Sequence, residues 1–550
     1  MNAATSFLSP LQTRWRSFRQ SRWFSPVLVV LISLAFIATH VFALHALPVF
    51  ADEAIYIRWA QLIQHEPQRY LFFALNDGKP PLFIWLVSGA LSLFPQSIDA
   101  VWIARFVSVL VGLVQLWVLD AIVRQLQGKS LTRFAAGIIV FTAPFWTFHH
   151  RIGLMDGLLT LGLSLSFWGL LGLQQTTLLP KTQKKLWRER VLFTVLAGLG
   201  LGLGLWTKTP ALFFTPVFVL LAYLAPFWLD DFRWQGITPQ WLFTRTLWFG
   251  AAGALGLATF FLLRISPSFG SLFGRSSDFT YSVSEVLAAG GVTVWNNIVR
   301  VTPWISTYLR PELITLTLIA LVVSKYRKMH WLLWLTALTF AAPLLILGKT
   351  LHPRYFLPVA PFITLSAAFM VHEAWEMIRK KESWEMTVIF FVLIGFYVIG
   401  SLRFLFFSYY EPNQIPFVLH DREQYLTEWS SGHGLAETRD LVVQEVHDGN
   451  YVTVITEGSF GSLPDGLLLY FDRIPEIESV RIEGLAQYPV KTIPDWAWEA
   501  AEDHTTWLVL NEHRNALPEE VMHNLHLEAS YPRPYGAPAL QVYELRPNKE

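Results

Sequence analysis

Two adjacent carboxylates follow the first long apolar run of the sequence. The run spans residues 26–47, and Asp52 and Glu53 stand shortly after it. A carboxylate at a membrane surface can accept the proton of an attacking hydroxyl, which is general-base chemistry. The spacing of Ile55 and Trp59 also predicts a helix that begins here, with Asp52 as its N-cap and Glu53 favouring the helix dipole. The residues alone leave both explanations open.

A lysine stands in a restricted turn further along the same segment. Lys79 belongs to the sequence Asp77-Gly78-Lys79-Pro80-Pro81, in which two prolines limit the backbone. An ammonium group held at the level of the lipid headgroups can pair with a lipid phosphate. Any interfacial lysine also extends toward headgroups without specificity, so the phosphate role is a hypothesis.

A turn between two later apolar runs carries a further acid and a cation. Arg151 and Asp156 lie in the turn that separates residues 131–149 from residues 155–174. An acid so close to an apolar zone is costly, and it is therefore more often functional than a surface acid. An ion pair of Asp156 with Arg151 or Lys79 would also explain it.

Two more turns place cations at the ends of apolar runs. Lys208 lies in a Thr-Lys-Thr-Pro turn, and His352, Arg354 and Tyr355 open a later run. These groups could bind phosphate or sugar. Simple anchoring of helix ends at the membrane surface is the alternative.

The composition limits the classes of protein and site. Of the 550 residues, 53% are hydrophobic and 15% are charged, against about a quarter charged in soluble domains. The absence of cysteine excludes disulfides and thiolate ligands, and a net charge of +1 does not suggest a nucleic-acid partner. No metal-ligand spacing is present, so we expect no required cofactor; a divalent cation would be compatible with the acids.

Eleven apolar runs predict transmembrane helices. They are residues 26–47, 104–123, 131–149, 155–174, 191–207, 209–229, 244–263, 311–324, 331–348, 354–374 and 386–408. The basic residues concentrate in alternate loops and in the N-terminal arm with Arg14, Arg16, Arg19 and Arg22. The positive-inside rule then predicts a cytoplasmic N-terminus, and it makes residues 80–95 an interfacial helix of the outer face.

This topology places the candidate residues on one side of the membrane. Residues 1–408 form a predicted membrane domain whose first outer loop spans 48–103. Residues 409–550 form a predicted extracytoplasmic α/β domain, with a helix at 434–447 and strands at 451–456, 480–483, 506–511 and 540–545. The turns around residues 52, 79, 156, 208 and 354 all face the same side as this domain, so an active site could assemble there.

Taken in order, these motifs resemble those of the GT-C glycosyltransferases of the protein O-mannosyltransferase and aminoarabinose-transferase superfamily, in a bacterial member. The resemblance rests on Asp52-Glu53, the Gly-Lys-Pro-Pro-Leu segment at 78–82, the turn from Arg151 to Asp156, Lys208-Thr-Pro, and Arg354-Tyr355 followed by Leu357-Pro358 and Pro361. About eleven spans with interfacial helices in the first outer loop also resemble the GT-C fold. The resemblance covers about 400 residues.

The resemblance implies transfer of a hexose or pentose from a polyprenyl-phosphate carrier to a lipid, glycan or protein acceptor, in an inverting reaction at the outer face of a cell (inner) membrane. It makes Asp52 the base, Glu53 its support and Asp156 a second acid. Lys79 would bind the carrier phosphate. Arg151, Lys208, His352, Arg354 and Tyr355 would be phosphate or sugar contacts.

Two other functions remain to be weighed. A transporter or flippase for lipid-linked sugars would also have many spans, but its key residues usually lie near the bilayer midplane and its sequence often shows repeats. A scaffold whose outer domain does the work would need only one or two spans. Polar residues gathered at outer helix ends favour the transferase.

Overall fold

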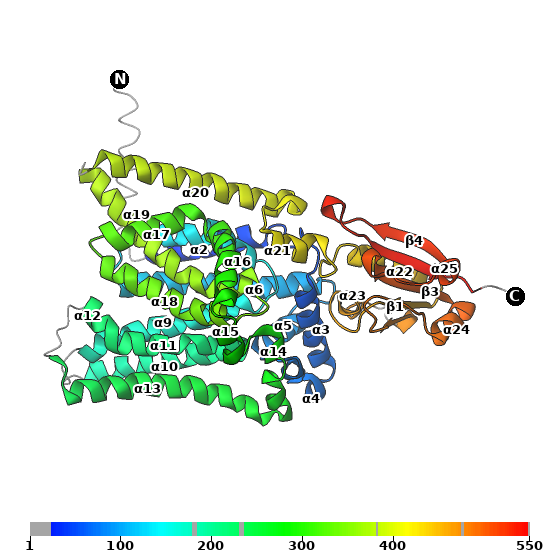
Figure 1. Cartoon of the computed structure of the whole chain (residues 1–550), viewed down its shortest axis with the longest axis horizontal. Coiled ribbons are helices and arrows are strands. Elements are labelled where there is room, and N and C mark those ends of the chain that lie inside the picture. The colour runs from blue at the N-terminus through cyan, green and yellow to red at the C-terminus, as the bar shows by residue number, and fades with distance from the viewer. Residues whose placement is uncertain (1–23, 179–183, 230–235, 381–382, 475–477, 548–550) are drawn as a thin grey trace, which may run out of the picture.

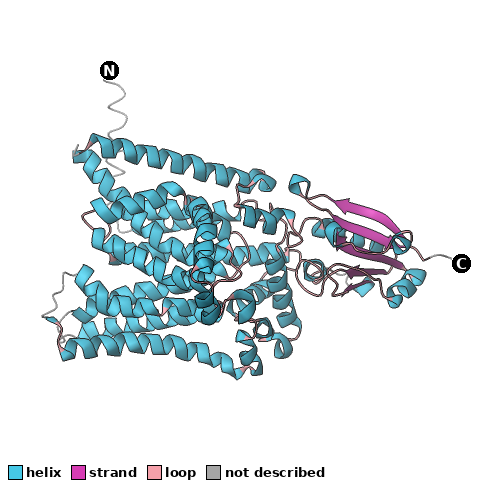
Figure 2. Ribbon diagram, in the orientation of Figure 1, coloured by secondary structure: helices cyan, strands magenta, loops and turns pink. Residues whose placement is uncertain are grey.

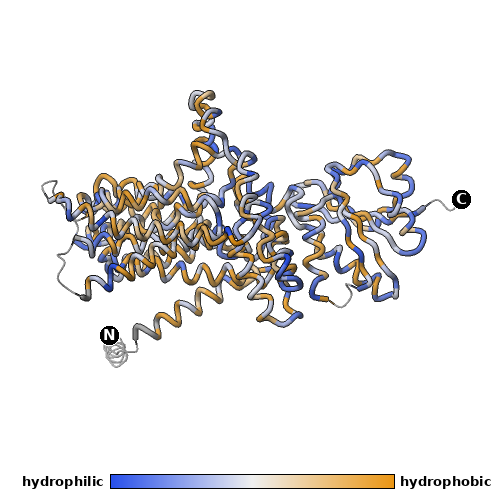
Figure 3. The backbone as a smooth tube through the Cα atoms, turned by 90° about the horizontal axis from the view of Figure 1, so that it is seen from below, coloured by the Kyte–Doolittle hydropathy of each residue, from blue (hydrophilic) through white to orange (hydrophobic). Residues whose placement is uncertain are grey.

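The protein consists of a helical bundle and a small sheet domain at one end of it (Figure 1). The computed structural model describes residues 24–178, 184–229, 236–380, 383–474 and 478–547. Strands gather in the end domain (Figure 2), and apolar residues dominate the bundle (Figure 3). The expected fold class, a multi-pass helical membrane protein with a C-terminal α/β domain, is confirmed.

Eight helical segments of the described chain are long and apolar enough to cross a membrane. They are α6 (Ala100–Gln125), α9 (Asp156–Leu178), α10 (Lys184–Thr207), the broken segment Thr209–Leu229 with α11 (Pro216–Val219) and α12 (Ala225–Leu229), α13 (Pro239–Phe261), α18 (Arg327–Leu347), α19 (Ala360–Lys380) with the 3-10 helix η7 (Pro353–Val359) before it, and α20 (Trp384–Tyr410). Each coincides with a run predicted to span.

Three predicted spans correspond to shorter helices, so the total of eleven stays a prediction. They are α2 (Phe24–Val41), α7 (Ser130–Thr142) and α17 (Pro311–Val323). The run at 131–149 is divided because Ala143 is extended before Pro144, which begins α8 (Pro144–His149). α17 meets α16 (Val292–Leu309) at a bend of 100°, where Arg310 has a φ of +68°.

The predicted interfacial run at 80–95 forms a helix that is too short to cross the hydrocarbon core. This helix, α5 (Leu82–Leu93), has 12 residues and packs against α3 (Ala51–His65). The same part of the chain contains α4 (Pro67–Tyr70) and the 3-10 helix η1 (Phe73–Asp77). Further short helices between α13 and α16 are the 3-10 helix η6 (Pro267–Phe273), α14 (Ser276–Phe279) and α15 (Val283–Ala288).

The predicted first outer loop and the C-terminal domain lie at the same end of the bundle (Figure 1). Several contacts join them: for example, Arg58 of α3 pairs with Asp472 at 2.8 Å, and Gln61 donates to the Leu469 carbonyl at 2.8 Å. The direction of the whole molecule across the membrane stays a prediction. Several basic residues behind that prediction lie outside the described residues, namely Arg14, Arg16, Arg19, Arg22, Lys181, Arg233 and Lys381.

Small residues allow α9, α10 and α13 to pack closely. A Cβ at Gly162 of α9 would lie 2.7 Å from the Gly204 nitrogen of α10, and a Cβ at Gly198 would lie 2.7 Å from the Ala252 carbonyl of α13. This is the close helix packing typical of glycine-rich membrane helices. Because α9 and α10 are antiparallel neighbours, the beginning of α9 at Asp156 comes next to the end of α10 at Thr207.

The C-terminal domain contains a mixed five-stranded sheet in the order β2-β1-β3-β5-β4. Its elements are α22 (Leu435–His447), β1 (Val452–Thr456), α23 (Asp465–Phe471), β2 (Val480–Gly484), α24 (Asp495–Asp503), β3 (Thr505–Asn511), α25 (Glu519–Met522), β4 (Leu525–Tyr531) and β5 (Leu540–Leu545). β1 is parallel to β2 and β3, with Val452 opposite Val480 and Thr505; β5 is antiparallel to β3 and β4. The sequence analysis missed β4, a polar edge strand whose side chains are mostly exposed.

Candidate active site

The start of α3 is held in place by Glu53, which is fully buried. The Phe50 backbone N–H donates to Glu53 Oε2 at 3.1 Å, so Glu53 caps its own helix. The Gly153 backbone N–H donates to Glu53 Oε1 at 2.6 Å. Glu53 therefore joins α3 to the turn before α9.

Arg105 of α6 completes the environment of Glu53. Its guanidinium donates two hydrogen bonds of 2.8 Å to the two carboxylate oxygens. It also donates to the carbonyls of Leu44, Leu47 and Pro48. A buried pair with this many hydrogen bonds is fully satisfied. The contacts favour a supporting role for Glu53, and its predicted part in catalysis stays a prediction.

Asp52 points to a different set of partners, although it is adjacent in sequence. The expectation that Asp52 is the N-cap of this helix is wrong: the N-cap is Phe50, and Asp52 lies in the first turn. Arg354 NH2 donates to Asp52 Oδ2 at 2.9 Å, and Lys79 Nζ lies 3.9 Å from Oδ1. Burial alone would raise the pKa of Asp52, but Lys79, Arg354 and Lys208 together lower it below its ordinary value. Asp52 is thus an ionised carboxylate between cations.

Lys79 is directed to this place by the turn before α5. Gly78 has a φ of +73°, which few other residues adopt, and it ends η1. Lys79 Nζ then lies 2.9 Å from Asp77 and 5.2 Å and 5.4 Å from the ring centres of Tyr56 and Trp59. Asp77 also pairs with Arg275 beyond η6.

The second acid pairs with the second lysine. Lys208 Nζ donates to Asp156 Oδ1 at 2.8 Å, and Asp156 is buried. Lys208 also lies over the ring of Tyr355, 4.8 Å from its centre. Burial lowers the pKa of Lys208, while the carboxylates of Asp156 and Asp52 oppose this shift.

Arg354 connects Asp52 to the segment after α20. Arg354 NH1 donates to Gln424 Oε1 at 2.6 Å, and Gln424 Nε2 lies 2.6 Å from His352 Nδ1. His420 contacts the same nitrogen of His352 at 2.7 Å. Burial lowers the pKa of both histidines, to about 4 for His420, so both are neutral near pH 7. His352 therefore reaches the site through Gln424.

Arg151 lies apart from this group. Its guanidinium donates to the carbonyls of His40, Phe42 and Ala43, and it stacks over the ring of Tyr409 at 4.4 Å. These contacts hold the chain between α2 and α3 rather than Asp156. The sequence analysis offered an Asp156–Arg151 pair as an alternative; the partner of Asp156 is Lys208 instead.

Several neighbours of the site were not predicted. Gln424, Tyr425 and His420 belong to the short helices α21 (Leu419–Arg422) and η9 (Glu423–Thr427), which have no distinctive motif. Tyr56 stands one helical turn after Asp52, and this spacing could have indicated it. Asp421 is also buried: it accepts a hydrogen bond of 2.5 Å from Tyr308, and burial raises its pKa to about 7.

The group formed by Asp52, Lys79, Asp156, Lys208 and Arg354 is called the carboxylate–cation cluster below. Three cations face two carboxylates in it, and Asp77, which pairs with Lys79, is itself shared with Arg275; cations gathered in this way suit an anionic ligand. Within the described ranges, no three His, Asp or Glu side chains gather as a metal site would require. Whether a divalent cation takes part stays open to test.

Comparisons with known proteins agree with this picture. Residues 70–264 match the family model described as dolichyl-phosphate-mannose-protein mannosyltransferase. Crystal structures of ArnT from Cupriavidus metallidurans have a similar fold. The form bound to undecaprenyl phosphate has a TM-score of 0.54 at 14% identity, covering 95% of this chain and 98% of that chain. The apo form has a TM-score of 0.55 at 14% identity, covering 94% and 97%. A comparison with curated protein sequences finds no significant match.

The motifs, the fold and the family model thus point in one direction. The match to ArnT extends over almost the whole of both chains, so it includes the membrane domain and the C-terminal domain. The family-model match includes Lys79, Asp156 and Lys208. The family-model match covers residues 70–264, about a third of the chain, and the fold of the whole chain is similar to that of ArnT, a GT-C fold.

Proposed function

We propose that the protein transfers a sugar from a polyprenyl-phosphate carrier to an acceptor hydroxyl, and that the carboxylate–cation cluster is the active site. The single observation that carries this proposal is the convergence of five charged residues from distant parts of the sequence. Arg354 contacts Asp52, Lys79 lies beside Asp52, and Lys208 contacts Asp156. The likeness to a solved ArnT with bound undecaprenyl phosphate supports the lipid carrier.

The cations match the charge that develops on the leaving group. A sugar linked to polyprenyl phosphate is a phosphodiester with one negative charge, and breaking the bond from the anomeric carbon to the phosphate oxygen leaves a second charge on the phosphate. Lys79 and Arg354 lie on either side of Asp52. Cations placed in advance at such a position stabilise the developing charge without reorganisation.

Asp52 is the proposed general base. The acceptor oxygen attacks the anomeric carbon, its proton moves to Asp52, and the bonding electron pair leaves with the phosphate. A carboxylate with a lowered pKa is a weak base in the free enzyme. When the donor phosphate draws Lys79 and Arg354 away from Asp52, they no longer lower the pKa of this carboxylate. The effect of burial then dominates, and the pKa of Asp52 rises. Donor binding would therefore activate the base.

Asp156 and Lys208 have a positioning role in this proposal. Asp156 is buried at the beginning of α9 and fixes Lys208 over the face of Tyr355. The exposed edge of this arrangement can bind sugar hydroxyls or the carrier phosphate. Attack of the acceptor on the anomeric carbon from the side opposite the phosphate would invert the configuration of that carbon.

The location follows from the same proposal. The cluster lies where the membrane domain meets the C-terminal domain, which the charge pattern of the sequence places outside the cytoplasm. An inner membrane of a cell envelope, with the reaction at its outer face, suits a lipid-carried donor. The transporter alternative receives less support, since the family model and the matched fold both belong to transferases.

The decisive experiment is to identify the lipid that the protein carries. The full-length protein would be purified in nanodiscs formed with native lipids, and bound polyprenyl-phosphate sugars would be measured by mass spectrometry. Asp52→Asn should retain unreacted donor, because it keeps the shape of the site and removes the base. Glu66→Gln, which changes an exposed acid after α3, is the matched control.

Two outcomes separate the proposal from its alternatives. Enrichment of a sugar-charged carrier on Asp52→Asn, compared with wild type and Glu66→Gln, would support the transfer reaction and identify the sugar. Equal amounts of bulk lipid on all three proteins, with no sugar-charged carrier, would remove the main support for a lipid-linked donor.

A further inference from the structure

A second cavity lies at the end of the bundle that is opposite the candidate active site. Its volume is about 630 Å³, and it is lined by the ends of α6, α9 and α12 and by the connection from α17 to α18. Helix α9 has Asp156 at its start and Gln174 near its end. With a rise of about 1.5 Å per residue, the cavity is about 27 Å from the carboxylate–cation cluster. It belongs to the other side of the membrane.

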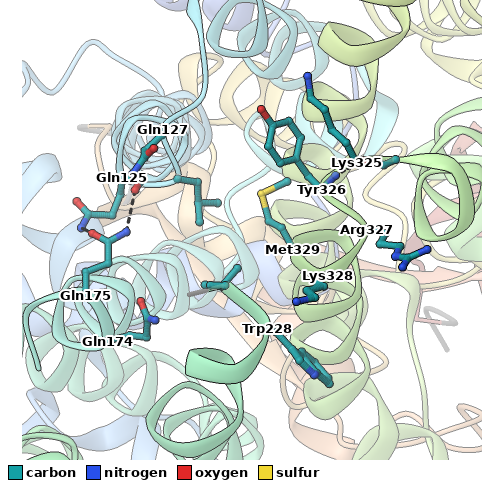
Figure 4. Close-up of a pocket in the computed structure, with 13 residues that line it drawn as sticks. Gln125, Gln127, Gln174, Gln175, Trp228, Lys325, Tyr326, Arg327, Lys328 and Met329 are labelled. Atoms are coloured by element: carbon teal, nitrogen blue, oxygen red, sulfur yellow. Dashed lines mark hydrogen bonds between the residues drawn. The ribbon is translucent and has the colours of Figure 1, made fainter. Parts of the chain in front are cut away.

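The lining of this cavity is polar and positively charged. Among the residues that the structure describes, four glutamines and three cations line it and no acid does; these residues are Gln125, Gln127, Gln174, Gln175, Lys325, Arg327 and Lys328. The glutamines lie on one side, and Tyr326, Met329 and Lys328 lie on the other (Figure 4). We call the cavity the amide–cation pocket. Amides and cations around one space match a ligand with several oxygen acceptors and negative charge.

The walls of the pocket are fixed by hydrogen bonds before any ligand arrives. Gln175 donates to the Gln125 carbonyl at 3.0 Å, which joins α9 to α6. Glu373 of α19 accepts from the Lys325 backbone N–H at 3.1 Å and from the Ser324 hydroxyl. The turn that presents the cations is therefore anchored to a buried acid.

A second acid of α19, Glu376, pairs with Lys325 at 3.0 Å and with Lys129 at 2.5 Å. Lys325 is thereby neutralised. Arg327 is exposed at the first position of α18 and adds positive charge at the rim.

Gln127 has an unusual backbone for its residue type. Its φ is +60°, and it follows the end of α6, a position that glycine usually occupies. Glycine is in fact the next residue, Gly128. An amide kept in a strained position beside a cavity indicates that the side chain has a use there.

We propose that the amide–cation pocket binds a phosphate ester, supplied as the headgroup of an anionic lipid in the leaflet opposite the active site. Arg327 supplies positive charge to the phosphate, and the Gln127 amide donates to its ester or glycerol oxygens. Leu126, Trp228, Leu229 and Met329 supply the apolar part of the lining, which suits the start of the acyl chains. The volume is in the range of about 300–1,000 Å³ that small ligands occupy. A soluble phosphate compound shares this chemistry, and the test separates the two sources.

The test measures thermal stability of the full-length protein in detergent micelles. Phosphatidylglycerol, phosphatidylcholine or inorganic phosphate would be added in steps, and the midpoint of unfolding would be followed by tryptophan fluorescence. A ligand that binds the folded state raises this midpoint. We expect phosphatidylglycerol to raise it more than phosphatidylcholine does. A shift with inorganic phosphate instead would assign the pocket to a soluble phosphate compound.

Three variants make the result specific to the pocket. Gln127→Gly removes the amide and suits the positive φ, so the protein should be at least as stable as wild type. Gln127→Gly and Arg327→Gln should each weaken the apparent affinity for the phosphate ligand by roughly 3- to 10-fold. Arg379→Gln removes a charge from the exposed end of α19 outside the pocket and should leave the affinity unchanged.

Two results would overturn the proposal. The first is an equal response to phosphatidylglycerol and phosphatidylcholine together with no response to inorganic phosphate. The second is an equal loss of affinity in Arg379→Gln and Arg327→Gln, which would assign the response to general surface charge.

Discussion

Arg354 donates to Asp52 across 2.9 Å, although 302 residues separate them in the sequence. This contact brings the beginning of α3 to the beginning of η7, and it places a guanidinium against the proposed base. The other end of the guanidinium reaches Gln424, at the entrance to the C-terminal domain. One side chain therefore joins three distant parts of the chain at the candidate site.

Asp52→Asn should lower turnover by roughly 100-fold or more, as expected for loss of a general base. Because the Asp52 side chain is 26% exposed and Arg354 keeps its hydrogen bond to Gln424, the thermal midpoint should fall only slightly, in contrast to a change at the fully buried Glu53. Turnover of the true donor and the unfolding midpoint would be measured together, with Glu66→Gln as control. Turnover within a few-fold of wild type would leave Asp52 with only a structural role, as the hydrogen-bond partner of Arg354.

Lys79→Ala should raise the KM for the lipid donor by roughly 10- to 100-fold, since a charge-assisted contact with phosphate is lost. Lys79→Arg should retain part of the affinity. Lys349→Ala is a suitable control, because Lys349 is an exposed cation that donates to the Ser277 carbonyl. An unchanged KM in Lys79→Ala would remove the phosphate role.

Glu53→Gln should destabilise the fold rather than alter the chemistry. The change leaves the buried Arg105 without its carboxylate, which costs about 3–5 kcal/mol in comparable pairs. The unfolding midpoint should fall, while the folded fraction keeps a KM near that of wild type. Adding Arg105→Gln should cost less than the sum of the two single changes. A stable Glu53→Gln protein with greatly reduced turnover would instead make Glu53 part of the catalytic step.

The pH dependence of the reaction tests the activation of Asp52 by the donor. The profile of kcat/KM reports the free enzyme, where cations keep the pKa of Asp52 low, and the profile of kcat reports the donor complex. A base must be deprotonated, so activity falls on the acid side of its pKa. We expect the acid limb of kcat to lie roughly one pH unit or more above that of kcat/KM. Coinciding limbs would contradict this mechanism.

Asp421 should make stability depend on pH. Burial raises its pKa to about 7 in the folded protein, so the folded state binds more protons than the unfolded state between about pH 4 and 7. The free energy of unfolding of the wild type therefore falls as pH rises through this window. Asp421→Asn has no group that titrates there and should not show this fall. The unfolding midpoint of Asp421→Asn relative to wild type should increase from pH 5 to pH 8. A constant difference would show that Asp421 does not titrate there.

The sequence alone was sufficient to predict the location of site residues that stand at the end of an apolar run. Asp52, Lys79, Asp156 and Lys208 each stand at such an end. Groups at the same ends of neighbouring spans meet at the same depth of a membrane, so the order of the runs predicted that these residues share a face. The strands of the C-terminal domain were predicted similarly, from their alternating or apolar patterns.

Other parts of the site depend on contacts that leave no local pattern. Asp52 and Glu53 are adjacent, but residues of a helix are rotated by about 100° from one to the next, so they face different partners. Only the folded chain shows that Glu53 meets Arg105 and that Asp52 meets Arg354. Gln424 lies in a segment without motif or periodicity, and its amide is recognised only beside Arg354.

The distance in sequence between Asp52 and Arg354 also has a consequence for biosynthesis. Ribosomes add roughly 5–20 residues per second, so Arg354 emerges roughly 15–60 s after Asp52. During that time the nascent protein contains Asp52 but not Arg354. Arg105, the partner of Glu53, is synthesised sooner, so the pair of Glu53 and Arg105 can fix the beginning of α3. The order of synthesis thus allows the supporting pair to form before the proposed catalytic pair, and a chain interrupted between these points would have a framework without an active site.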